Sequence, residues 1–491
     1  QIGFVPWDFS LAGRQTSGEP GLPERVPSMW PEAAVDTARL GPSPDEVQAR
    51  FQHDAAVQVE LAAAEPVVRD PVALCFDETG QLFVAEMGDY PTGPGDDPQA
   101  VSRIVRLADA DGDGRYESAA VFADQLSFVT GLTAWRGGLV VTLAGEVCWL
   151  ADTDGDGLAD TREQWFAGFT EENTQLRANH PTLAPDGSFY VANGLRGGEV
   201  VAADPRWQTT TNEPPVSIRG RDFRFDPCGR PLASGSGSFE AVTGNGQFGL
   251  SIDDFGTSFL CSNRNPCMQV MLEDRDIRRN PAAALGVAIH DVSPAGEQSR
   301  IFPISSGWTT SNLHAGQFSA ACGVTIHRGH GLPAAFHGNA FTCDPTGNLV
   351  HRQQLVRSGP AYSSLLNSSR REFLASSHDW FRPVALADGP DGCLYVIDMA
   401  RAVIEHPQFM PDELKNRPDL LPGRSRGRLW RIAAADRQPA PPAAALAAAT
   451  DQQLVALLAH PNGWHRDTAS RLLLERSDRL PREDLQTLAL E

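Results

Sequence analysis

Short apolar runs alternate with turn residues along most of the chain. From about residue 60 onward a unit recurs in which a glycine turn, one further residue and a β-rich pair follow one another. The segments that carry it are DETGQLFVAE, WRGGLVVTLA, PDGSFYVANG, DDFGTSFLCS, DPTGNLVHRQ and GPDGCLYVID. Glycine adopts the positive φ angles of tight turns, and the residues after it favour half-buried strands. The pattern predicts a series of antiparallel hairpins.

The spacing of these hairpins predicts a β-propeller. The turn glycines are Gly80, Gly138, Gly187, Gly256, Gly347 and Gly392. Repeats at such intervals in an all-β chain favour a propeller over a sandwich. We therefore predict an all-β fold with six blades, with seven as the alternative. The long interval between Gly256 and Gly347 holds either an insertion or a degenerate blade.

Both ends of the chain differ in texture from this middle part. Residues 1–60 are rich in Pro, Gly and charge and predict an N-terminal extension, so the propeller is expected over 61–436. Residues 437–491 begin with a Pro/Ala linker and continue with apolar residues at helical spacing, with Thr450 or Asp451 as the N-cap. Two helices joined around HPNGW resemble a HEAT-type unit. One such unit cannot bury its own face, so it packs on the propeller or continues into further repeats.

Composition excludes several classes of function. The chain has 41 basic and 62 acidic residues, a formal net charge of −21, so phosphate backbones repel it and nucleic acid is not expected as a partner. No apolar run approaches the roughly 18 residues of a membrane helix, so no membrane-spanning segment is expected. Lys415 is the only lysine, which removes P-loop chemistry. The HExxH, CxxC and CxxCH motifs are also absent from the sequence.

Two acidic loops have the spacing of calcium-binding loops. The first offers oxygen ligands at positions 1, 3, 5, 9 and 12 of an EF-hand-type loop: Asp152, Asp154, Asp156, Asp160 and Glu163. The second contains Asp109, Asp111 and Asp113 but has Ala120 at position 12. Alternate carboxylates can converge on one Ca²⁺ ion, in a structural rather than a catalytic role. The alternative is a pair of solvated hairpin turns, because Asp-Gly pairs form turns on their own.

Two motifs resemble the glucose/sorbosone dehydrogenases, propellers that bind pyrroloquinoline quinone (PQQ). WFRPVALADGPDGCLYVIDM (380–399) resembles the signature of their last blade, and Arg382 takes the second arginine position of that signature while Trp380 replaces the first. SNRNPC (262–267) resembles their HRNP motif, which implies that Arg264 and Asn265 lie beside the quinone. PQQ is a planar tricarboxylate, and guanidinium groups bind carboxylates with two parallel hydrogen bonds.

A second resemblance covers nearly the whole chain. VRDPVALCFDETGQLFVAEMGDYP, HDVSPAGEQSRIFPIS, TTSNLHAGQFSAACGVTI, AFTCDPTGNLVHR and EFLASSHDWFRPVALADGPDG are similar to a family of large bacterial extracytoplasmic proteins named as membrane-bound dehydrogenases. In that family a propeller is followed by HEAT repeats and a haem-c domain. The resemblance implies a periplasmic or secreted protein whose signal peptide and haem-c domain lie outside this sequence. It also implies a cytochrome c-type electron acceptor.

The chain departs from the quinoprotein pattern at the catalytic base. That pattern places a histidine about ten residues before the Asp of a PDG turn, and here Leu176 occupies the position. His180 is four residues further on, about 13 Å along a strand. The cofactor-contacting lysine of the family has no counterpart either. His180 and His314, which lies in a Gly/Ser/Thr-rich loop, are the candidate bases. For both, the alternative is a hydrogen-bonded histidine with no role in catalysis.

Three further groups have the residue types of a site. His378 and Asp379 could form an oriented pair, and Arg401 with its neighbours Glu405 and His406 could line a cleft or form salt bridges. Two cysteines in neighbouring β-like segments, Cys322 and Cys343, could form a cross-strand disulfide.

Three functions remain open. The first is a dehydrogenase of a sugar or another alcohol or aldehyde, in which PQQ accepts hydride, Ca²⁺ polarises the quinone and His180 or His314 takes the hydroxyl proton. Arg382, Arg264 and Asn265 would hold the cofactor. The second is a non-catalytic, calcium-stabilised propeller that binds carbohydrate or protein. The third is a redox-free enzyme acting on polysaccharide. The fold hosts all three.

Overall fold

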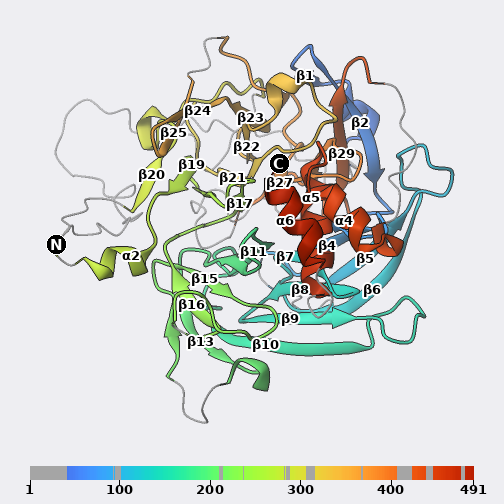
Figure 1. Cartoon of the computed structure of the whole chain (residues 1–491). Helices are drawn as coiled ribbons and strands as arrows, with labels where there is room; N and C mark the ends of the chain where they lie inside the picture. Colours follow the sequence, from blue (N-terminus) through green and yellow to red (C-terminus); the bar gives the residue numbers. More distant parts are fainter. Residues whose placement is uncertain are drawn as a thin grey trace. The chain divides into compact units, whose positions relative to one another are not determined.

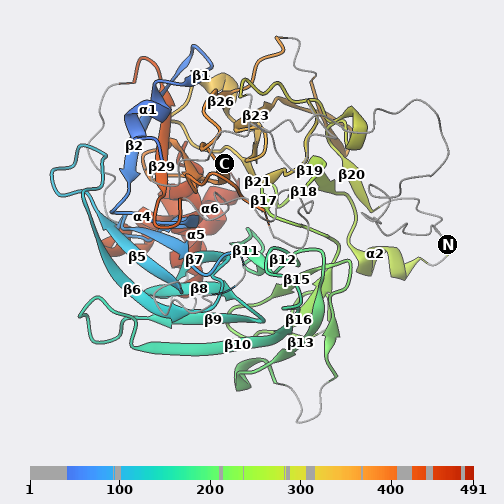
Figure 2. The same cartoon turned by 180° about the vertical axis from the view of Figure 1, so that it is seen from behind.

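The structure is a computed structural model that describes residues 41–91, 93, 101–208, 214–235, 237–280, 282, 288–305, 316–365, 369–405, 423–437, 446–476 and 481–490. Six antiparallel sheets of four or more strands follow one another around a central axis, as Figures 1 and 2 show from opposite sides. The protein is therefore a six-bladed β-propeller, as the turn spacing predicts. His314 lies outside the described residues.

The inner four strands of blades 1 to 5 are close in sequence within each blade. Blade 1 contains β3 (Pro71–Phe76), β4 (Leu82–Met87), β5 (Ser102–Ala108) and β6 (Ser118–Leu126). Blade 2 contains β7 (Gly131–Trp135), β8 (Gly138–Leu143), β9 (Glu146–Ala151) and β10 (Thr161–Phe169). Blade 3 contains β11 (Asn179–Leu183), β12 (Phe189–Ala192), β15 (Asp222–Phe225) and β16 (Phe239–Val242).

The second half of the ring repeats the arrangement. Blade 4 contains β17 (Leu250–Ile252), β18 (Ser258–Ser262), β19 (Asn265–Val270) and β20 (Ile289–Asp291). Blade 5 contains β21 (Cys322–Ile326), β22 (Ala340–Asp344), β23 (Leu349–Gln353) and β26 (Leu374–Ser376). Blade 6 contains β27 (Pro383–Asp388), β28 (Leu394–Asp398), β29 (Arg428–Ala434) and β2 (Val57–Ala64).

The ring is closed by a strand from the N-terminal side. β2 pairs antiparallel with β29, with Val57 opposite Ala434 and Ala64 opposite Arg428. Blade 6 thus combines three strands from the far end of the propeller with one strand that precedes blade 1. β2 crosses the expected domain boundary at residue 61. The short β1 (Phe51–His53) also joins the propeller, as an outer strand on β26.

Several elements decorate the blades. β13 (Gly198–Ala202) and β14 (Val216–Ser217) belong to the blade 3 sequence but pair onto β10, which widens blade 2. β24 (Leu355–Ser358) and β25 (Ala361–Ser364) form a separate hairpin. Within the described part of the propeller, two short α-helices are α1 (Pro44–Gln48) and α2 (Asp274–Arg279).

Five of the six predicted turn glycines lie at the same place in their blades, at the connection between the first and second strands. Gly80, Gly187, Gly256 and Gly392 have φ angles of 77–83° and lie between the first and second strands of blades 1, 3, 4 and 6. In blade 2 the positive φ belongs to Gly137 rather than to Gly138. Gly347 lies between the second and third strands of blade 5. The long interval before it therefore reflects a different hairpin in blade 5, together with the long connection from β20 to β21.

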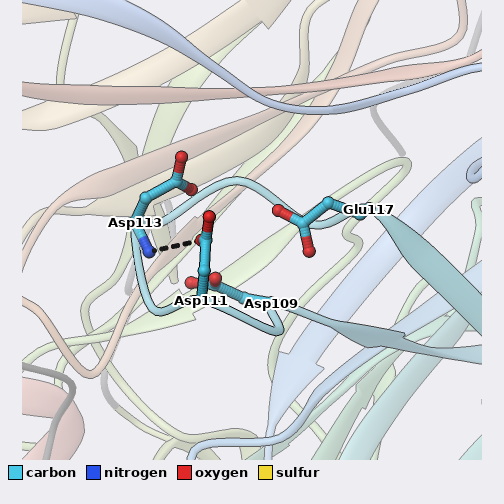
Figure 3. A group of neighbouring side chains, drawn as sticks. All are labelled: Asp109, Asp111, Asp113 and Glu117. Carbon is cyan, nitrogen blue, oxygen red and sulfur yellow. Dashed lines mark hydrogen bonds between the residues drawn. The ribbon is translucent and has the colours of Figure 1, made fainter.

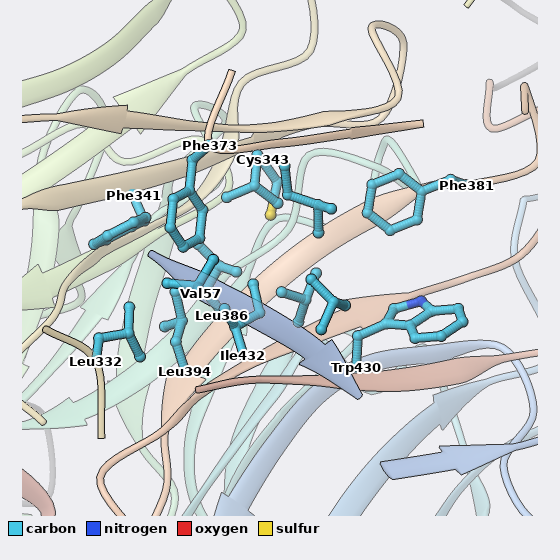
Figure 4. Packing of buried hydrophobic residues seen from close by; sticks show 14 of the residues in the cluster. Val57, Leu332, Phe341, Cys343, Phe373, Phe381, Leu386, Leu394, Trp430 and Ile432 are labelled. Carbon is cyan, nitrogen blue, oxygen red and sulfur yellow. The ribbon is translucent and has the colours of Figure 1, made fainter. Parts of the chain in front are cut away.

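The hydrophobic core lies between neighbouring blades. In the cluster of Figure 4, Phe341 of blade 5 and Leu394 of blade 6 are both fully buried, as is Trp430. A second cluster between blades 2 and 3 is aromatic, with Phe225 at 4.9 Å from Phe166 and stacked on Phe189. Because a blade is covered on both faces, β4, β8 and β28 are buried along their whole length, whereas the sequence predicts half-buried strands.

Hydroxyl groups link the innermost strands. Thr133 Oγ1 of β7 donates to the Pro181 carbonyl of β11, and Thr325 Oγ1 of β21 donates to the Leu386 carbonyl of β27. Ser251 Oγ of β17 accepts a hydrogen bond from the Ile326 amide of β21. Small polar residues thus satisfy backbone groups at the axis, where strands of different blades do not form ladders.

The described C-terminal residues contain three α-helices: α4 (Asp451–Leu457), α5 (Gly463–Glu475) and α6 (Arg482–Leu490). α4 begins with a capping box at Thr450, which confirms the predicted N-cap. α5 contacts the connection between the first and second strands of every blade. The contacting residues of these connections are Glu78, Arg136, Gly187, Asp254, Arg328 and Pro390. We call the face that carries these connections the lower face. None of the described helices is long and apolar enough to cross a membrane.

Candidate functional site at the propeller axis

A cavity of about 250 Å³ lies along the axis of the propeller. All six innermost strands line it, from β3 to β27. His180 lines it where β11 begins, at the upper end. Arg328, Asp388, Trp464 and Asp467 line it at the lower face, where α5 lies across the ring. The cavity therefore joins a histidine at one end to a charged group of side chains at the other.

His180 is held in an unusual backbone conformation. Its φ angle is 51°, in the left-handed region that few residues with a Cβ adopt. Pro181 follows it, and the Thr182 hydroxyl donates to the His180 carbonyl. Non-glycine residues in the left-handed region are strained and persist only where the surrounding structure holds them. Such residues cluster at functional sites.

The protonation state of His180 follows from its surroundings. Burial lowers the pKa of the imidazole to about 4, so the ring is neutral at neutral pH. Its Nδ1 lies 2.7 Å from Asn179 Oδ1. The Asn179 amide donates through Nδ2 to the carbonyls of Arg177 and Gln247, which identifies Oδ1 as the acceptor. Nδ1 of His180 therefore carries the proton, and Nε2 has a free lone pair that can accept another.

Sequence reasoning proposed His180 but missed Asn179. The sequence does contain a signal, because the amide of an asparagine directly before a candidate histidine base can orient the imidazole ring. Adjacent residues on a regular strand point to opposite faces, so the pair would normally be dismissed. The left-handed φ of His180 breaks that alternation, and it is not visible in the sequence.

Arg382 holds backbone segments on the face opposite the lower face. We call this face the upper face. Its Nε, Nη1 and Nη2 donate to the carbonyls of Arg401, Pro345 and Ala402 at 3.1, 2.7 and 2.6 Å. These bonds tie the β22–β23 turn of blade 5 to the segment after β28. A guanidinium with three backbone acceptors has little left to offer a ligand carboxylate.

The other two residues expected at the cofactor lie in blade 4 and are also engaged. Arg264 Nη2 donates to Gln317 Oε1 at 2.7 Å, and Asn265 Nδ2 donates to Asp291 Oδ1 at 3.0 Å. Arg382, Arg264 and Asn265 do not line the axial cavity. As they lie, these side chains do not form a cradle for a planar tricarboxylate, so we derive no catalytic step through PQQ.

Arg401 and the pair of His378 and Asp379 have structural partners, and His406 lies outside the described residues. Arg401 forms a buried ion pair with Asp70, at 2.7 Å between Nη2 and Oδ1. His378 Nδ1 lies 3.5 Å from Asp379 Oδ1, although a regular strand would have separated them, because both lie in the connection between β26 and β27. Trp380 packs against Gly41 and does not line the cavity.

All eight cysteines lie in the described part of the chain and are unpaired. Cys322 and Cys343 are directly opposite each other on β21 and β22. Burial raises the pKa of both thiols well above the ordinary value.

The two acidic loops are equivalent turns of neighbouring blades. The first, in blade 2, connects β9 to β10, and the second, in blade 1, connects β5 to β6. In each loop the leading aspartate accepts hydrogen bonds from two glycine amides. Asp152 accepts from Gly155 and Gly157, as Asp109 does from Gly112 and Gly114.

The carboxylates that converge differ from those expected. In blade 1, Glu117 joins the three predicted aspartates, as Figure 3 shows. In blade 2 only Asp152, Asp154 and Asp156 gather. Asp160 instead accepts from the Thr153 hydroxyl at 2.9 Å, and this bond, with that from the Thr161 hydroxyl, lowers the pKa of its carboxyl. Glu163 pairs with Arg206 and accepts from the Trp165 indole. The loop of blade 1 thus gathers four carboxylates and that of blade 2 three.

We expect Ca²⁺ to raise the thermal midpoint of the metal-stripped protein. An ion that binds only the folded state at 100 times its Kd stabilises it by about 2.7 kcal/mol. Asp109→Asn should reduce this shift, because it removes a charge from the four-carboxylate group. Glu163→Gln is the matched control and should leave it unchanged, because Glu163 faces Arg206. Differential scanning fluorimetry with and without Ca²⁺ checks both variants, and an equal shift in Asp109→Asn would count against the site.

Comparison with solved structures finds matches of low identity. The PQQ-bound aldose sugar dehydrogenase of Streptomyces coelicolor is 15% identical, with a TM-score of 0.39, over 78% of this chain and 100% of that chain. The holo PQQ domain of pyranose dehydrogenase from Coprinopsis cinerea is 13% identical, with a TM-score of 0.43, over 78% and 97%. A luciferin-regenerating enzyme is 13% identical, with a TM-score of 0.42, over 79% and 99%. These similarities concern the fold alone.

A comparison with curated proteins gave no match. One family profile matches residues 43–436, which is the propeller from α1 to just past β29, and its description is "Domain of unknown function (DUF7133)". The match covers well over half of the sequence. The chain therefore belongs to the DUF7133 family.

Proposed function

We propose that this protein is an extracytoplasmic oxidoreductase that oxidises a hydroxyl group of a sugar or another small alcohol, and that His180 accepts the hydroxyl proton. The observation that carries the proposal is the neutral imidazole at the axial cavity, with Nδ1 bonded to Asn179 and Nε2 free. A general base needs both a lone pair and a fixed direction, and His180 has both.

Oxidation of an alcohol removes a proton from oxygen and a hydride from carbon. His180 provides for the proton. The motif resemblance around Arg382 and SNRNPC names PQQ as the candidate cofactor, which would supply a hydride acceptor and would pass electrons to a cytochrome c-type partner. Because the described side chains do not form a cradle for PQQ, its binding has to be measured separately from the role of His180.

His180→Asn tests the base. Asparagine keeps a donor for Asn179 and tolerates a left-handed φ, but it has no nitrogen where Nε2 lies. With PQQ, Ca²⁺ and an artificial electron acceptor, we expect its kcat/KM to fall at least about 100-fold. His53→Asn, at an exposed histidine far from the axis, is the matched control. An unchanged rate in folded His180→Asn would contradict the assignment.

The pH profile gives a second readout of the same base. Since the pKa of His180 is lowered to about 4, the reactive neutral form is present above that value. Activity is therefore expected to persist to about pH 5 and to fall as the pH drops through 4. Loss of activity near the ordinary histidine pKa of about 6.5 would point to another base.

A non-catalytic binding propeller is the second candidate. It is favoured by the engagement of Arg382, Arg264 and Asn265 with protein acceptors. Calorimetric titration of PQQ with and without Ca²⁺ separates the two functions. Calcium-dependent heat supports the oxidoreductase. Saccharide binding with neither PQQ heat nor turnover would support the binding function.

A further inference from the structure

Three histidines meet where the C-terminal helices dock on the lower face. His330 lies in the connection between β21 and β22 of blade 5, His460 lies between α4 and α5, and His465 is in the first turn of α5. The ring centroids of His330 and His460 are 5.8 Å apart, and those of His460 and His465 are 4.2 Å apart. We call these three residues the docking histidines. They bring imidazoles from the propeller and from the helical segment into one cluster.

Hydrogen bonds fix the position of the proton on two of these rings when they are neutral. His465 lies 3.0 Å through Nε2 from the Pro390 carbonyl, so Nε2 carries the proton. Its Nδ1 is buried and has no hydrogen-bond partner. His460 Nδ1 accepts from the Asn462 amide at 3.1 Å. A second proton on His465 would therefore be placed on a buried nitrogen with no acceptor, beside another imidazole.

The charged groups around the cluster do not favour protonation overall. Burial is the largest cause that lowers the pKa of each of the three rings. His460 also lowers the pKa of the other two, and the hydrogen bonds with Asn462 and Pro390 raise the pKa of His460 and of His465. Arg437 and His327 act in the same direction on His330, and Arg466 does so on His460. Asp391 is the opposing charge, and its carboxylate is shared with Arg437 and Arg431.

We propose that protonation of the docking histidines releases α5 from the propeller and opens the lower end of the axial cavity. α5 supplies Trp464 and Asp467 to the cavity wall, so its departure removes the lower closure. Ion pairs of Arg328 with Asp467 and of Arg466 with Asp254 oppose release. Burial raises the pKa of the Asp467 carboxyl, whereas the arginines that face Asp254 hold the pKa of that carboxyl low. The response to pH that we assign to the docking histidines has therefore to be separated from titration of Asp467.

The direction of the pH effect follows from linkage. In the released state the rings are solvated and titrate near the ordinary pKa of about 6.5, whereas in the docked state their pKa values lie lower. The released state therefore binds more protons below about pH 6.5. Docking is complete above that pH and weakens as the pH falls. Each unit of difference in pKa shifts the docking equilibrium up to about tenfold.

Hydrogen exchange of the whole chain at pH 7.5 and pH 5.5, corrected for the intrinsic rate, tests the proposal. In the wild type we expect α5 to lose protection at least about tenfold at the lower pH, relative to β28. The variant His330→Gln/His460→Gln/His465→Gln should lose this dependence, because glutamine at 465 can still donate to Pro390 but cannot gain a proton. His53→Gln is the matched control. If the triple variant does not fold, the single variant His465→Gln replaces it. We expect α5 of this variant to lose less protection at pH 5.5 than α5 of the wild type.

Two results would overturn the proposal. One is equal protection of α5 at both pH values in the wild type. The other is the same loss of protection in the triple variant, which would assign the effect to the carboxylates of the ion pairs. Neither result depends on turnover, so the test is independent of the proposed oxidoreductase activity.

Discussion

Asp70→Asn is expected to lower the free energy of unfolding by about 3–5 kcal/mol, the cost of leaving one partner of a buried ion pair unpaired. Asp70 and Arg401 have exposures of only 4% and 1%. Arg401 Nε and Nη2 both contact Asp70 Oδ1, Nη1 donates to the Tyr90 carbonyl, and Asp70 Oδ2 accepts from the Ser425 amide. The pair joins the segment after β28 of blade 6 to the residue before β3 of blade 1, where the ring closes.

Denaturant unfolding followed by circular dichroism measures this loss. Asparagine keeps the shape of the side chain and tolerates the φ of 45° at position 70, so the change isolates the charge. The double variant Asp70→Asn/Arg401→Met should lose less than Asp70→Asn alone, because no buried charge is left without a partner. If the single variant unfolds like the wild type, the pair does not stabilise the closure.

Phe225→Ala is also expected to cost about 3–5 kcal/mol, through the cavity that it leaves in the aromatic cluster between blades 2 and 3. The ring is fully buried and lies 4.9–6.1 Å from Phe166, Phe189 and Trp207. Phe255→Ala is the matched control, because that ring is 80% exposed at the tip of a blade 4 turn. It should change stability by no more than about 0.5 kcal/mol. Equal effects of the two changes in thermal unfolding would contradict the packing described for this cluster.

Much of the fold could be predicted because each blade begins with a hairpin that has a local signature. Gly80, Gly187, Gly256 and Gly392 adopt positive φ between the same two strands of their blades, so each of them marks one blade. Gly347 belongs to another hairpin, and only strand pairing distinguishes the two. The pairing of β2 with β29 joins segments at opposite ends of the propeller, and no local pattern indicates it.

The site was harder to predict because its residues have several possible partners. His180 could be proposed from its residue type, but its orientation depends on Asn179 and on a backbone angle. The spacing that predicts Glu163 as a calcium ligand is equally compatible with its ion pair to Arg206, which comes from a different turn. Likewise Arg382 matches a cofactor motif in sequence, while in space the nearest acceptors are backbone carbonyls. Tertiary neighbours decide these roles.

The strand β2 has a consequence for how the chain is made. It leaves the ribosome before any blade does, and its partner β29 ends at residue 434, roughly 370 residues later. At about 5–20 residues per second, the nascent chain carries this strand without its partner for about 20–70 s. An unpaired strand with apolar residues is open to wrong pairing and to proteases for that time. Only a chain translated through residue 434 can bury it, so interrupted synthesis leaves a product that quality-control factors can recognise.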